Sequence, residues 1–398
     1  MTLPQLFLCH HNAYAREVAE LATLLRLRGV VPWVDKERGG FNVGDDSPEE
    51  ARRVIRTECF GLLLYATSRV FDRWFVREIE LRAALAKKRA DPAFVITSFA
   101  RRITFRKLSE LSKAQLGSDV AKFHGISCSH PSNPVQRHAD QSRMATEALR
   151  KWLASHEPTQ PVSLQFSTRQ VFPDESNDLL RVDATDYLRS APFDPRRWGV
   201  VFEGLIAIER EFAARFGRLR IAVHGSKHLT AAFLFGRVFA RYPLDIRQTA
   251  TDVWSGDVQP AQVQPFLVSR QNADFHDQTL VVLIASGAKN LDPRVNQLLD
   301  MDPVWHPSRL TLIPVDGPLV VDNALCLAMV NQAYTEIERA LATAAFRSVH
   351  LFVAAPQSFI MLLAQMWAGL PTTHLYEWDN GCYVQSCVIG GGAAGSND

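Results

Sequence analysis

The sequence has few cysteines and no long apolar run, and both absences narrow what the chain can be. No stretch approaches the roughly 18 uninterrupted apolar residues of a membrane span, and the short apolar run at the N-terminus has no Lys or Arg before it, unlike a signal peptide. We therefore expect a cytoplasmic protein without a membrane partner. The six cysteines form no CxxC pair, and no histidines stand near them at zinc-ligand spacing, so we expect neither a disulfide framework nor a metal site.

The sequence also lacks an excess of charge of either sign. Lys plus Arg (44) against Asp plus Glu (42) gives +2 over 398 residues, which offers no whole-chain argument for binding DNA. The two parts differ, however: residues 1–155 hold 25 basic and 17 acidic side chains (+8), and the remainder holds 19 and 25 (−6). This length predicts two or three domains, and the charge difference predicts two of unlike character.

The first 100 residues alternate short apolar runs with helical patterns. Strands are expected at 6–9, 30–34, 60–65 and 93–97, and helices at 15–28 and 73–87, with a Gly-bearing polar loop over 36–50. Strands separated by crossover helices form a parallel sheet with helices on both faces. The sequence therefore predicts a flavodoxin-like α/β domain over residues 1–155, followed by a linker at 156–164.

The second half contains an internal repeat with an offset of 130 residues. A strand and turn at 220–227, a helix through Gly236 and a strand at 244–248 are matched by a strand and turn at 350–357, a helix through Trp367 and a strand at 374–378. Without a gap, Lys227 aligns with Gln357. Two strand-turn-helix-strand copies predict a pair of Rossmann-type units over residues 165–390, with a flexible tail at 391–398.

One carboxylate is predicted to lie inside an apolar helix face. At 100° per residue, Glu78 falls within the stripe that contains Trp74 and Leu81, whereas Glu80 faces solvent. A carboxylate among apolar side chains carries a desolvation cost, so Glu78 is a functional candidate. The alternative is an ion pair with Arg82, one helical turn away.

Four segments of the first domain resemble the Toll/interleukin-receptor (TIR) family. They are Phe7-Leu-Cys-His10, Pro32-Trp-Val-Asp35, Leu63-Leu-Tyr-Ala-Thr-Ser68 and Trp74-Phe-Val-Arg-Glu78. The resemblance implies that Glu78, the glutamate of the W-x-x-x-E segment, cleaves the nicotinamide ribosyl bond of NAD⁺. One carboxylate can stabilise an oxocarbenium-like centre without a metal, and nicotinamide leaves as a neutral molecule. NAD⁺ is then a substrate, and no cofactor is expected.

The same resemblance indicates where NAD⁺ binds. Its contacts are expected from the following residues: His10, Trp33, Asp35, Ser68 and Trp74. Trp33 has core packing as its alternative role, and Asp35, at the end of a parallel strand where ligands bind, has loop capping.

Only two lysines follow residue 155, and both end a strand that runs into Gly-x-Lys. These turns are Gly225-Ser-Lys227 and Gly287-Ala-Lys289. Glycine admits a ligand close to the backbone, and lysine supplies the counter-charge to an anion, so we expect a phosphate site; surface lysines are the alternative. The pattern GxxxxGK[ST] is absent, which disfavours nucleotide hydrolysis here.

The second half resembles the SAVED domain, a fused pair of CARF-like units. The resemblance is carried by Leu351-Phe-Val-Ala-Ala-Pro356-Gln357, His374-Leu-Tyr376-Glu-Trp378 and His224-Gly-Ser-Lys-His228. It implies a site for a cyclic oligonucleotide, and cyclic tri-adenylate is the expected activator. Phosphate and base contacts are expected from the following residues: Gly225, Ser226, Lys227, His228, Trp254, Lys289, Pro356, Gln357, Tyr376 and Trp378. Each aromatic has core packing as its alternative.

Together the two resemblances predict a TIR-SAVED effector of bacterial CBASS antiphage defence. In this hypothesis a cyclic nucleotide drives chains into a head-to-tail homo-oligomer or filament, residues 39–46 of a neighbouring chain complete the site at Glu78, and NAD⁺ is consumed. The rival hypothesis is a non-enzymatic scaffold in which Glu78 is only packed and paired with Arg82. A third possibility is ring-nuclease activity of the second domain against its own ligand.

Overall fold

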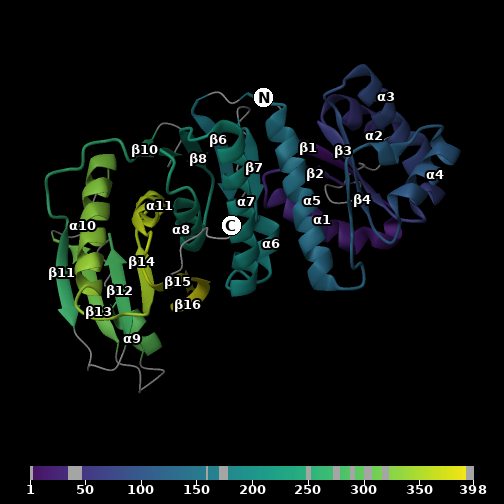
Figure 1. Cartoon of the computed structure of the whole chain (residues 1–398). Helices are drawn as coiled ribbons and strands as arrows, with labels where there is room; N and C mark the ends of the chain where they lie inside the picture. The colour runs from purple at the N-terminus through teal and green to yellow at the C-terminus, as the bar shows by residue number, and fades with distance from the viewer. Residues whose placement is uncertain are drawn as a thin grey trace. The chain divides into compact units, whose positions relative to one another are not determined.

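The computed structural model of the chain describes most of its length (Figure 1). The described residues are 3–34, 47–157, 160–169, 178–247, 252–271, 278–286, 292–299, 307–315 and 322–390. They form two compact units. The first comprises Met1–Gln165, Pro173–Asp183 and Arg210–Gly217, and the second comprises Phe166–Phe172, Ala184–Glu209 and Arg218–Asp398.

The first unit is built on a five-stranded parallel sheet with the order β2-β1-β3-β4-β5. This is the strand order of flavodoxin-like folds. Its strands are β1 (Gln5–Cys9), β2 (Val31–Trp33), β3 (Gly61–Ala66), β4 (Val95–Ala100) and β5 (Gly125–Ser127). Every residue of β3 is buried, as expected of a central strand that is covered by helices on both faces. The expected parallel α/β architecture is therefore present in this part of the chain.

The helices of the first unit are α1 (Ala15–Arg26), α2 (Ser47–Thr57), α3 (Arg82–Ala90), α4 (Phe105–Leu116) and α5 (Pro134–Ala154), with three single turns of 3₁₀ helix, η1 (Asn12–Tyr14), η2 (Val70–Asp72) and η4 (Val120–Lys122). One segment differs from all of these: η3 (Val76–Leu81) is a π-helix that runs directly into α3. Extra residues in a helical turn of this kind often mark functional sites.

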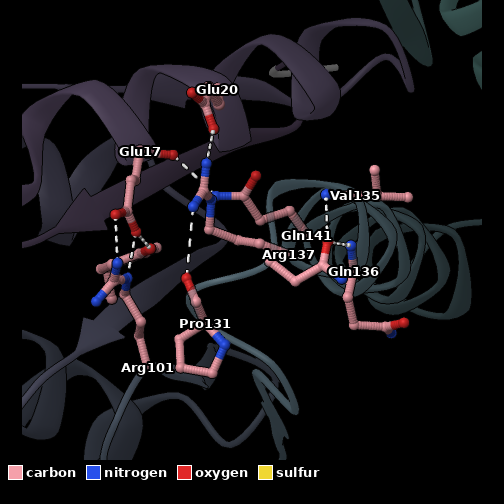
Figure 2. Close-up of polar contacts among 10 residues, drawn as sticks. Glu17, Glu20, Arg101, Pro131, Val135, Gln136, Arg137 and Gln141 are labelled. Carbon is pink, nitrogen blue, oxygen red and sulfur yellow. Dashed lines mark hydrogen bonds and ion pairs between the residues drawn. The ribbon is translucent and has the colours of Figure 1, made fainter.

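A polar network ties α1 to α5 and to the carboxyl ends of the strands (Figure 2). The Glu17 carboxylate accepts two hydrogen bonds from the Arg101 guanidinium, one of them 2.5 Å long, and another from the Tyr65 hydroxyl at 2.6 Å. The Gln141 amide of α5 donates to the Glu17 carbonyl at 2.9 Å, and Arg137 donates to Glu20 at 3.4 Å. Because Arg101 and Glu17 are largely buried, removal of either would leave an uncompensated charge in the interior.

Two further sheets follow. One has the order β10-β9-β8-β6-β7, and the other has the order β11-β13-β12-β14-β15-β16. Their strands are β6 (Val162–Ser167), β7 (Leu180–Asp183), β8 (Ile221–His224), β9 (Leu244–Arg247), β10 (Val253–Ser255), β11 (Phe266–Gln271), β12 (Thr279–Ala285), β13 (Ser308–Pro314), β14 (Ser348–Ala354), β15 (Thr372–Asp379) and β16 (Cys382–Ile389). The linker expected at 156–164 ends inside β6, because Val162 and Leu164 are buried there.

The remaining helices are α6 (Thr185–Arg189), α7 (Pro195–Phe216), α8 (Leu229–Val238), α9 (Asp292–Leu299), α10 (Asn323–Leu341) and α11 (Gln357–Met366). None of the described helices is both long enough and apolar enough to cross a membrane.

The internal repeat of the sequence is present in the second unit. β8, α8 and β9 form one strand-turn-helix-strand copy, and β14, α11 and β15 form the other. The two helices pack directly on each other (Figure 1). They approach so closely at Gly236 that a Cβ atom there would lie 2.1 Å from the Met361 carbonyl oxygen. The small residue thus fixes how the two copies meet.

Candidate functional site

Glu78 lies on the π-helix η3 between two arginines. Its Oε1 accepts a hydrogen bond from Arg77 Nε at 2.9 Å, and its Oε2 accepts one from Arg82 Nε at 2.7 Å. The hydrogen bond from Arg77, with a further contribution from Arg82, holds the pKa of the Glu78 carboxyl below its usual range. The side chain is 27% exposed. Glu78 is therefore an accessible, ionised carboxylate, and the ion pair with Arg82 named as the alternative is present.

The predicted orientations of the two glutamates are wrong. Glu80, expected to face solvent, is only 3% exposed, and Trp74, the origin of the expected buried stripe, is 55% exposed. The reason is the π-helix at 76–81. Its hydrogen bonds run from i to i+5, so the 100° rotation per residue of an α-helix does not apply there.

Glu78 lines a surface cavity of about 540 Å³. Arginines of α2 and α3 line this cavity together with the carboxylate, and apolar side chains complete the walls. The lining residues are Arg52, Arg56, Glu78, Ile79, Arg82, Ala83, Leu85, Ala86, Arg89, Leu116, Gly117 and Ser118. The volume is within the range of about 300–1,000 Å³ that small-molecule sites have.

The other residues predicted to contact NAD⁺ do not line this cavity. His10 and Trp33 are buried, and Trp33 stacks on Phe7 with ring centroids 4.5 Å apart, which is the packing role named as its alternative. Ser68 and Trp74 are exposed. Asp35 and the loop 39–46 lie outside the described residues.

In the second unit the turn between β8 and α8 is tightly built. Gly225 has φ +107°, and a Cβ there would lie 2.4 Å from the Phe166 carbonyl oxygen, so only glycine fits. Lys227 is 2% exposed, and its Nζ donates to the Gly225 carbonyl at 2.7 Å. Burial lowers the pKa of Lys227 to about 7. No described carboxylate forms an ion pair with this ammonium group.

His228 and Thr168 hold the start of α8. The His228 backbone N–H donates to Thr168 Oγ1 at 2.8 Å, and the His228 Nδ1 lies 2.9 Å from the same oxygen. Burial, with a contribution from Arg169, lowers the pKa of His228 to about 4. Its ring is therefore neutral at physiological pH. Ser226, the remaining predicted residue of the turn, is half-buried, and its carbonyl accepts from the Thr168 N–H at 2.9 Å.

Glu377 is a site residue that the sequence patterns did not single out. It lies on β15, is 1% exposed, and accepts a hydrogen bond from the Thr230 N–H in the first turn of α8 at 2.5 Å. Arg169 lies 3.5 Å from its other oxygen. Burial raises the pKa of the Glu377 carboxyl. The only signal in the sequence was a carboxylate between the two aromatic residues Tyr376 and Trp378.

The second copy of the repeat reaches the same turn. Pro356 caps α11, and the Gln357 Nε2 donates to the Lys227 carbonyl at 2.7 Å. The structure therefore brings together six of the predicted ligand residues: Gly225, Ser226, Lys227, His228, Pro356 and Gln357.

The predicted aromatic contacts differ in accessibility. Trp254 is buried and donates to Asp252 at 2.7 Å, and Tyr376 is buried and stacks on Phe352 at 4.1 Å; both have the core role named as their alternative. Trp378 is 38% exposed, with the guanidinium of Arg294 4.2 Å above its ring. Lys289 lies outside the described residues.

Part of the second half of the chain matches a known family of sensor domains. Residues 206–389 match the family model of SAVED, the SMODS-associated sensor domain fused to various effectors. The chain therefore carries a SAVED domain, and the match contains both copies of the repeat.

The chain is similar to a protein of Moraxella osloensis and to a receptor of Acinetobacter baumannii. CD-NTase-associated protein 4 of Moraxella osloensis is 24% identical over 183 residues, which cover 43% of this chain and 37% of that protein's length. Two structures of the Acinetobacter baumannii Cap4 SAVED/CARF-domain containing receptor, bound to the cyclic trinucleotides 3′3′3′-cAAA and 2′3′3′-cAAA, are 15% identical. Each has a TM-score of 0.51 and covers 86% or 87% of this chain and 84% of the receptor chain. At this identity the likeness is one of fold.

Proposed function

We propose that the chain is an NAD⁺ hydrolase that a cyclic oligonucleotide activates, and that it acts in CBASS antiphage defence. The proposal assigns residues 1–155 to a TIR domain and residues 165–390 to a SAVED sensor. The observation that carries it is a SAVED match at residues 206–389 in the same chain as a parallel α/β unit in which Glu78 lines a cavity. The Acinetobacter receptor with a cyclic trinucleotide supports a cyclic tri-adenylate as the activator.

The arrangement at Glu78 supports the chemistry. When the C1′–N bond of NAD⁺ breaks, its electron pair stays on nicotinamide, which leaves uncharged, and C1′ becomes an oxocarbenium-like cation. An ionised carboxylate stabilises that cation. Water then bonds to C1′, and its proton is released to solvent, giving ADP-ribose. Arg77 and Arg82 keep the carboxylate ionised and fix both of its oxygens.

The second unit supplies the ligand site of the proposal. The turn at Gly225–Lys227 supplies the Lys227 side chain for a phosphate, and Gln357 joins the other copy to it. Trp378 is exposed enough to stack on a base. In this mechanism ligand binding drives head-to-tail association of chains, and the loop 39–46 of a neighbour completes the active site.

The test incubates the purified full chain with NAD⁺ and a panel of cyclic di-, tri- and tetranucleotides, and follows nicotinamide release together with particle size. We expect both to rise with the same cyclic trinucleotide. Glu78→Gln should assemble but release no nicotinamide, whereas the control Glu110→Gln, an exposed carboxylate on α4, should match the wild type.

Three other outcomes would each change the proposal. Full activity of strictly monomeric protein without any nucleotide would exclude regulation by assembly. Ligand-dependent assembly without turnover under any activator would favour the non-enzymatic scaffold. Loss of intact cyclic nucleotide after denaturation of the complex would identify a ring nuclease.

A further inference from the structure

We infer that Arg52, Arg56 and Arg89 bind the pyrophosphate of the dinucleotide that is cleaved at Glu78. The inference rests on the proposed function, since it names how this cavity recognises its substrate. It assigns the cavity two parts: a carboxylate end, where the ribosyl bond lies, and an arginine end, where the phosphates lie.

Two helices present these arginines to one cavity. Arg52 and Arg56 are four residues apart on α2, so they lie on the same face of that helix. Arg82 and Arg89 are seven residues apart on α3 and likewise share a face. All four line the cavity of about 540 Å³ together with Glu78.

The charges in the cavity are not balanced. Four guanidinium groups against one carboxylate give a formal charge of +3, and Arg82 is already engaged by Glu78. In the described part of the chain, no carboxylate forms an ion pair with Arg52, Arg56 or Arg89. Their neighbour on the same helix is different: Arg53 does not line the cavity and forms ion pairs with Glu50 and Glu58.

Unneutralised arginines that line one cavity repel each other, and an anion relieves that repulsion. The guanidinium group matches phosphate oxygens with two parallel N–H donors. A pyrophosphate carries two negative charges on adjacent phosphates, so it can engage arginines from both helices at once. Ile79, Leu85 and Leu116 supply apolar wall for the flat rings at the two ends of a dinucleotide.

Binding is tested on the full chain with ADP-ribose, which keeps the pyrophosphate, and with adenosine, which has no phosphate. A charged hydrogen bond contributes about 1.5–3 kcal/mol, so Arg52→Gln and Arg56→Gln should each weaken ADP-ribose binding about 10- to 100-fold. The matched control Arg53→Gln, on the same helix, should stay within about twofold. Equal binding of ADP-ribose by all four proteins, or tighter binding of a single-stranded 20-mer DNA than of ADP-ribose, would overturn the inference.

Turnover separates this inference from the proposed function. Nicotinamide riboside has the scissile bond but no phosphate. Arg52→Gln should lower kcat/KM for NAD⁺ and leave kcat/KM for nicotinamide riboside unchanged, whereas Glu78→Gln should abolish both. Equal losses on both substrates in Arg52→Gln would show that the arginine acts through Glu78 and would refute a phosphate contact. If the wild type cleaves neither substrate in the presence of any cyclic nucleotide of the panel, the proposed function fails, and the ADP-ribose titration still decides the phosphate site.

Discussion

The Gln357 side-chain amide donates a 2.7 Å hydrogen bond to the Lys227 carbonyl, and the two residues are separated by the 130-residue offset of the internal repeat. Equivalent positions of the two copies are therefore in direct contact. Residues that meet in this way lie near the axis that relates two similar units, where one ligand can touch both. Gln357 and Lys227 thus mark a place at which the two copies of the repeat meet.

Replacing Gln357 by Glu should remove the hydrogen bond to the Lys227 carbonyl. A carboxylate has almost the same shape but no N–H to donate, so it would face the Lys227 carbonyl as a second acceptor. We expect the free energy of unfolding of the second unit to fall by about 1–3 kcal/mol, measured by urea unfolding. The same change at Gln259, which is exposed in a loop, should have no effect beyond error. Equal stability of both variants would show that the contact contributes nothing.

The α8–α11 contact predicts a large effect of a single methyl group. In Gly236→Ala the new Cβ would meet the Met361 carbonyl oxygen at 2.1 Å, and backbone cannot rotate aside as a side chain does. We expect a loss of several kcal/mol in the unfolding free energy, as for other overpacked interiors. Gly199→Ala on α7, where nothing lies within 4 Å, should instead stabilise by up to about 1 kcal/mol. Thermal unfolding of both variants checks the contrast.

The architecture was predictable from sequence because it depends on periodicity. Short apolar strands that alternate with amphipathic helices predict parallel α/β units, and the 130-residue offset predicts two equivalent copies. The strand–helix alternation and the repeat each extend over many residues, so one residue that departs from the pattern does not change the predicted architecture.

The orientation of single side chains was not predictable in the same way. One π-helix over 76–81 exchanges the environments of Glu78 and Glu80, and no pattern in the sequence announces it. Tyr376 and Trp378 are two residues apart on one strand, so the period of the strand places them on the same face, yet Tyr376 is buried against Phe352 and Trp378 is accessible. Glu377 accepts a hydrogen bond from the backbone N–H of Thr230, which is 147 residues away in the sequence. Such contacts are set by tertiary packing.

The pH dependence of NAD⁺ cleavage should depend on Arg77. The hydrogen bond from Arg77 lowers the pKa of Glu78, so the carboxylate stays ionised, and activity persists, below the ordinary value of 4.5. In Arg77→Gln the pKa of the Glu78 carboxyl should rise, and the acid limb of the pH profile of nicotinamide release should move to higher pH. Arg69→Gln, which removes the exposed partner of Asp72, is the control. Superimposable profiles in all three proteins would mean that a group other than Glu78 controls the acid limb.

Lys227 is a buried lysine without an ion-pair partner in the described part of the chain, and its burial predicts that stability depends on pH. Its pKa falls from 10.5 to about 7, so between these values the unfolded chain binds a proton that the folded chain does not. The free energy of unfolding should therefore rise with pH across that window. The destabilisation caused by the buried charge, which we call its burden, should be greatest at pH 7 and below. At about 1.4 kcal/mol per pKa unit, that burden is on the order of 3–5 kcal/mol.

The variant Lys227→Met, which is similar in length but uncharged, should remove this burden. We expect its second unit to be more stable than the wild type at pH 7, with the difference shrinking steadily at pH 8, 9 and 10. Guanidinium unfolding followed by tryptophan fluorescence measures both curves, and Lys107→Met, at an exposed position, controls for the general loss of a lysine. Since the proposed phosphate contact is lost as well, the same variant should bind the cyclic trinucleotide less tightly. Greater stability together with weaker binding would show that Lys227 serves ligand recognition and destabilises the fold. A difference in stability that does not change with pH would show that the lysine is not neutral in the folded chain.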